Sequence, residues 1–166
     1  NVLDSAEFTG ANNEFSNRII GANSTAVTLT NWNRDANYEI DVTSLIQTHV
    51  AQADWCGGNA ISMFIENGGA HSLYSLERDP AKAAVLHLDY QVADENDPGC
   101  NGGVIQAQII DGNDDVSEDT GGRDFIDTLV NVNSSQDVGL RFQTVNLPPQ
   151  PASGNLTIDA RLRLHT

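Results

Sequence analysis

The chain has 166 residues, and its 23 acidic residues outnumber its 8 lysines and arginines, which gives a formal net charge of −15. A chain of this length forms one compact domain. Because so acidic a protein repels phosphate backbones and anionic lipid headgroups, we expect neither nucleic acid nor a membrane as its partner. No apolar stretch approaches the roughly 18 residues of a membrane-spanning helix.

Alternation of apolar and polar residues predicts a series of short strands. The clearest is at the end of the chain, where the apolar positions are Leu156, Ile158, Ala160, Leu162 and Leu164. The other candidates are 26–32, 37–41, 60–66, 71–78, 86–90, 103–110, 126–132 and 138–143. Many short strands between turn-forming residues indicate an all-β fold, an antiparallel jelly-roll-like β-sandwich.

One segment has a helical pattern instead. Residues 41–50 begin with a capping residue and place Leu45, Ile46 and Val50 on one face. We expect a short helix here that plugs an open end of the sandwich or covers a sheet edge.

The composition changes at residues 93–102, which are rich in Asp, Asn and Gly together with Pro98. This composition predicts a linker between two halves, residues 1–92 and 103–166.

Several motifs in the two halves resemble a known module. They are 41–47 (DVTSLIQ), 55–61 (WCGGNAI), 86–90 (LHLDY) and 138–148 (VGLRFQTVNLP). These motifs resemble the β-sandwich repeat modules of bacterial secreted and surface proteins, of the DNRLRE-type, carbohydrate-binding-like kind. Residues 1–92 are similar to the C-terminal half of such a module and 103–166 to its N-terminal half, so the order is circularly permuted.

The reversed order implies that the two halves together complete one sandwich, within one chain or between neighbouring chains. Exchange between chains is head-to-tail and propagates as a filament, with 156–164 as the assembly strand. The sequence thus predicts an extracellular structural subunit whose partner is itself. The alternative is a carbohydrate-binding or adhesive module of a larger surface protein, with a polysaccharide as partner.

One acidic cluster offers side-chain oxygens at the alternating spacing that calcium coordination uses. Its candidate ligands for structural calcium are Asp111, Asn113, Asp114, Asp115, Glu118 and Asp119. The alternative is a solvated acidic turn.

Two cysteines, Cys56 and Cys100, allow one disulfide, with two buried thiols as the alternative. Asn23, Asn133 and Asn155 begin N-glycosylation sequons. The sequons favour a secreted or cell-surface protein.

Trp55 and Tyr74 are candidate rings for glycan stacking, with core packing as the alternative for Trp55. The four histidines are dispersed and lack ligand spacing, and no nucleophile with a base is evident. The sequence therefore predicts no catalytic residue and no enzyme.

Overall fold

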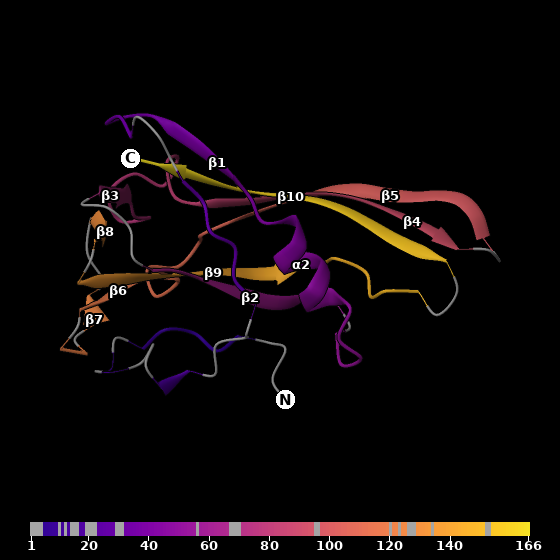
Figure 1. Ribbon diagram of the computed structural model, residues 1–166, viewed down its shortest axis with the longest axis horizontal. Helices are drawn as coiled ribbons and strands as arrows, with labels where there is room; N and C mark the ends of the chain where they lie inside the picture. The colour runs from indigo at the N-terminus through magenta and orange to yellow at the C-terminus, as the bar shows by residue number, and fades with distance from the viewer. Residues whose placement is uncertain are drawn as a thin grey trace.

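In the described part of the chain, two four-stranded sheets face one another and are accompanied by a short helix (Figure 1). The computed structural model describes residues 5–9, 11, 13, 17–18, 23–28, 32–55, 57–66, 71–94, 97–119, 121–122, 124–125, 129–133, 135–151 and 154–166. The elements are β1 (Asn37–Asp41), α2 (Thr43–Val50), β2 (Asn59–Ile65), β3 (His71–Tyr74), β4 (Val85–Asp94), β5 (Asp97–Gln108), β6 (Asp115–Asp119), β7 (Asp124–Phe125), β8 (Leu129–Val132), β9 (Gln136–Val145) and β10 (Asn155–His165). The all-β expectation with one helix is confirmed.

The strand orders are β1-β10-β4-β5 in one sheet and β2-β9-β6-β7 in the other, with β3-β8 as a separate pair. All described neighbours are antiparallel. The core between the sheets includes Leu86, Leu88 and Leu164 from one sheet and Leu140 and Phe142 from the other. The apolar sides of the alternating strands thus form the interior.

β10 is completed within the chain. It pairs with β1 over 161–165 and with β4 over 155–163. Its apolar residues are all buried: Leu156, Ile158, Ala160, Leu162 and Leu164. The two halves thus pair within one chain in this structure, and exchange of this strand between chains, which would require both ladders to open, stays a prediction.

The expected linker at 93–102 is wrong. Residues 101–103 pair with Val92, Gln91 and Tyr90, so β4 and β5 form a long hairpin through this region. Close packing explains why a glycine stands at position 103, since a Cβ there would lie 3.1 Å from the Tyr90 hydroxyl. This part of β5 is therefore rich in glycine, as a loop would be, although it is a paired strand.

α2 begins at Thr43, two residues later than predicted, and buries Ile46 and Val50. Val42 N–H donates to the carbonyl of Ala160, and Ala160 N–H donates to Thr43 Oγ1. The helix therefore takes over the side of β10 where β1 ends, which confirms that it covers a sheet edge.

Several predicted strand limits differ from the structure. Residues 26–28 are not in a strand, and 29–31 lie outside the described residues. The strand predicted at 71–78 ends at Tyr74, because 76–78 form a turn. The acidic cluster, for which a solvated turn is the alternative to a calcium site, is partly in a strand, because Asp115–Asp119 forms β6 between β9 and β7. Among the described residues, no helix is long and apolar enough to cross a membrane.

Candidate functional site

The outer edge of β5 is open in the described part of the chain. β5 pairs on one side with β4 and ends the sheet on the other. Ile109 N–H donates to the carbonyl of Ala84, so the odd-numbered residues direct their backbone groups toward β4. The even-numbered residues direct theirs outward, and they are Gly102, Val104, Gln106 and Gln108.

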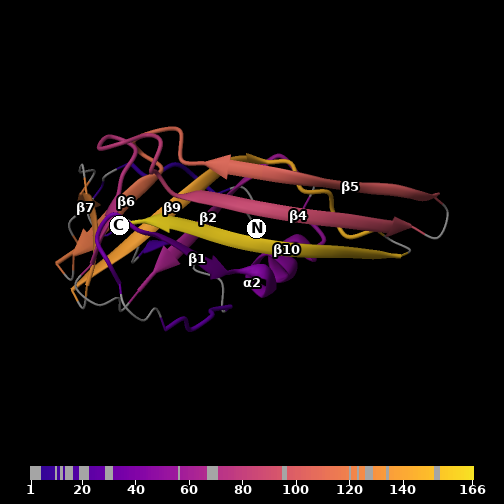
Figure 2. The same cartoon turned by 90° about the horizontal axis from the view of Figure 1, so that it is seen from above.

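From Pro98 to Gln108 this edge carries no charged side chain, because no Asp, Glu, Lys or Arg occurs between Asp97 and Asp111. Val104 is 60% exposed, and Ile110, just past the strand, is 66% exposed. Proteins usually protect open edges with charges, prolines or bulges. An uncharged edge in a chain of net charge −15 is therefore a surface suited to pairing with another strand. Figure 2 shows β4, β5 and β10 running side by side beyond the second sheet.

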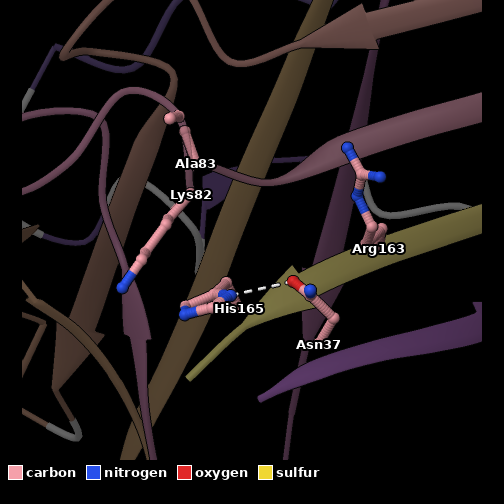
Figure 3. A pocket seen from close by; sticks show the side chains of 6 residues that line it. Asn37, Lys82, Ala83, Arg163 and His165 are labelled. Atoms are coloured by element: carbon pink, nitrogen blue, oxygen red, sulfur yellow. Dashed lines mark hydrogen bonds between the residues drawn. The ribbon is translucent and has the colours of Figure 1, made fainter. Parts of the chain in front are cut away.

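A second feature is a pocket of about 240 Å³ beside the C-terminal end of β10. Its lining residues are Asn37, Ala81, Lys82, Ala83, Arg163 and His165 (Figure 3). They come from the first residue of β1, the turn before β4 and the outer face of β10. Three of these side chains are basic, and none is acidic.

The basic side chains of the pocket differ in their partners. Arg163 is exposed and has no ion pair with any described residue. Lys82 Nζ lies 3.6 Å from Asp35 Oδ1 and 4.4 Å from the centre of the Tyr74 ring. These contacts hold the ammonium group beside the pocket.

His165 Nδ1 lies 2.8 Å from Asn37 Oδ1, to which it donates as the neutral Nδ1–H tautomer. Its Nε2 is buried and has no hydrogen-bond partner in the structure. Burial and the nearby Lys82 charge lower the pKa of His165, and the carboxylates of Asp35 and Asp79 oppose this. The imidazole is thus mostly neutral at pH 7.

The structure corrects Trp55 as a candidate glycan contact. It is 3% exposed, and its Nε1–H donates to the carbonyl of Leu147 at 2.9 Å. A ring inside the core cannot stack on a sugar, so core packing is the role that the structure shows.

Tyr74 lies half-buried at the margin of the pocket. Its hydroxyl donates to Asp35 Oδ1 at 2.9 Å. Its ring packs edge-on against the His165 ring, with the ring centres 5.0 Å apart. The Arg78 guanidinium and the Lys82 ammonium both lie over the ring, at 4.6 and 4.4 Å. Contacts within the chain thus already occupy the ring that glycan stacking would need.

The predicted calcium ligands do not converge in the described structure. Asp114 is completely buried and accepts bonds from Arg141 Nη1 at 2.7 Å and Gln143 Nε2 at 2.6 Å. Asp111 and Asp119 each accept a backbone N–H within their own turns. The described residues contain no group of three acidic, histidine or cysteine side chains that could hold a metal.

The other three candidate ligands are equally dispersed. Asn113 donates to Glu7 Oε1, and Glu118 is buried in β6. Asp115 is 1% exposed, with Oδ2 accepting the Leu76 N–H. Burial, together with the charges of Glu77 and Asp114, raises the pKa of Asp115 to about 8. Structural calcium stays a prediction, which melting with calcium and with chelator tests.

The cysteine and sequon predictions also stay open. Cys56 lies outside the described residues, as does the side chain of Cys100 in β5. Asn23 and Asn155 are exposed, whereas the amide of Asn133 donates to Gln136 Oε1 at 2.6 Å. Exposure leaves the first two sequons accessible.

Sequence reasoning missed both the open β5 edge and the pocket. The edge was hidden by the expected linker, although the uncharged run between Asp97 and Asp111 was a readable signal. The pocket joins residues that are far apart in the chain. The feature of the sequence that pointed toward it was the single lysine of the chain, Lys82.

Comparisons with family models, with curated proteins and with solved structures found no match to this chain. The resemblance to bacterial surface modules therefore stays a prediction, and the fold and surfaces of the chain itself have to carry the functional argument.

Proposed function

We propose that this chain is an extracellular structural subunit whose copies link head-to-tail by pairing strands at the edges of the β1-β10-β4-β5 sheet. The observation that carries this proposal is the open, uncharged edge of β5 with its exposed Val104. Backbone groups along such an edge are satisfied when another strand pairs with them.

The direction of the strands favours head-to-tail addition. In this sheet every neighbour is antiparallel, so the two outer strands, β1 and β5, run in opposite directions. A second copy in the same orientation can therefore place its β1 antiparallel to β5 of the first. That contact joins two different surfaces and leaves a new β5 edge open, so addition continues into a filament.

Edge addition replaces the exchange of half-modules in this proposal. β10 keeps both of its ladders within its own chain, and no strand has to leave the core. Because each copy carries a net charge of −15, copies repel one another at separations up to the Debye length, about 10 Å at 0.1 M salt, and beyond that distance the repulsion is screened. Assembly should therefore strengthen as salt rises.

A matched pair of substitutions at Val104 tests the proposal. Val104→Pro removes an N–H that faces the open edge and leaves the β4 ladder intact, whereas Val104→Thr keeps that N–H and the β-branched shape. Sedimentation and electron microscopy should show growing filaments for the wild type and for Val104→Thr, and monomers for Val104→Pro. A wild type that stays monomeric at high concentration and high salt, or that stops at dimers, contradicts head-to-tail addition.

A further inference from the structure

The pocket beside the end of β10 is lined by positively charged side chains, although the chain as a whole is strongly acidic. The chain has a single lysine and seven arginines against 23 acids. Lys82 and Arg163 nevertheless line one pocket to which no acidic side chain contributes. Figure 3 shows them on opposite sides of the opening, with His165 and Asn37 below.

The side chains present hydrogen-bond donors that suit an anion. Arg163 lacks an ion pair among the described residues, so its guanidinium is available. Asn37 uses its Oδ1 to accept from His165, which leaves its N–H groups to donate. Lys82 adds an ammonium whose position Asp35 and Tyr74 already hold. Donors fixed in advance lose little conformational entropy when a ligand binds.

We propose that this pocket binds an oxyanion, a single carboxylate or sulfate group, between Lys82 and Arg163. A pocket of about 240 Å³ has room for such a group. Arginine and lysine together provide charge-assisted hydrogen bonds to its oxygens. The site is separate from the β5 edge, so this inference does not rest on the proposed function.

His165 couples the site to pH. Burial and the Lys82 charge oppose protonation of its ring, whereas Asp35 and Asp79 favour it, and Arg163 lines the same pocket. An anion in the pocket offsets the two cations, so the imidazole gains a proton more readily when the site is filled. Binding should therefore strengthen as pH falls from 8 to 5.5.

Calorimetric titration at constant ionic strength tests the site with two probes. Inorganic sulfate represents a free ion, and trigalacturonate represents a carboxylate on a sugar. Saturable binding of either probe supports the proposed site. The probe that binds more tightly identifies the source of the oxyanion. Lys82→Gln and Arg163→Gln should each weaken binding about tenfold. The control is Arg161→Gln, which removes the same charge from the same face of β10. Arg161 is paired with Asp41 and Asp159 and does not line the pocket, so this substitution should leave binding nearly unchanged.

Two further outcomes overturn the proposal. One is the absence of saturable binding by the wild type for both probes at pH 5.5. The other is equal weakening by Arg161→Gln and Arg163→Gln, which shows a general charge effect and no site. His165→Gln should bind both probes equally well at pH 8 and pH 5.5, and a pH dependence that survives this substitution contradicts the role of the imidazole.

Discussion

Nη1 of Arg141 donates to Oδ1 of Asp114 at 2.7 Å, and Asp114 is completely buried. The same guanidinium donates through Nε to the carbonyl of Ser5, so one side chain of β9 holds both the acidic cluster and the N-terminal segment. The buried acid is thus accommodated by a cation from the neighbouring strand and needs no metal to balance its charge.

Arg141→Met should lower the free energy of unfolding by about 3 kcal/mol, because it leaves the Asp114 carboxylate buried without its cation. Arg161→Met is the control, since its pairs with Asp41 and Asp159 are solvent-exposed and contribute little to stability. Urea unfolding of both variants measures the difference. Equal losses in the two variants would show that the Asp114 pair has no special weight.

Asp115 should make stability depend on pH. Its pKa is about 8 in the folded protein against 3.8 in the unfolded chain, so the folded state holds a proton that the unfolded state has released. The free energy of unfolding therefore falls as pH rises from 4 to 8. Asp115→Asn should remove this part of the slope and make the protein more stable than the wild type at pH 8.

The matched control for that experiment is Asp111→Asn, which changes an exposed carboxylate in the same acidic segment. Its unfolding curves should show the wild-type pH dependence. A slope that persists unchanged in Asp115→Asn would mean that Asp115 is ionised in the folded protein at neutral pH.

Trp55 provides a test of the corrected assignment. Trp55→Phe keeps most of the buried ring but removes the N–H that donates to Leu147, so it should cost about 1 to 2 kcal/mol of stability. Thermal or urea unfolding measures this cost. A variant with unchanged stability and altered polysaccharide binding would restore Trp55 to the glycan-contacting role.

The sequence predicts the alternating strands well because burial on one side of a sheet imposes a period of two. The apolar residues between Leu156 and Leu164 follow that period without interruption, and each of them is buried. Prediction fails where a residue type has two physical uses. Gly103 has the composition of a linker but lies under Tyr90, and Asp115 has the composition of a turn but is buried in β6.

The pocket could not be predicted for a different reason. Asn37, Lys82 and His165 come together only because β10 lies between β1 and β4, and that strand order has no local signal. The motifs that resemble those of surface modules predict a sandwich, but they do not say which strands form its edges.

Amide hydrogen exchange along β5, measured at rising protein concentration, tests the central claim most directly. In dilute protein, the outward-facing amides of Gly102, Val104, Gln106 and Gln108 should exchange rapidly, while those facing β4 are protected. In concentrated protein at high salt, the outward-facing amides should become protected as larger species form. Larger species that leave these amides unprotected, or protein that forms no larger species under these conditions, would contradict strand pairing at the β5 edge.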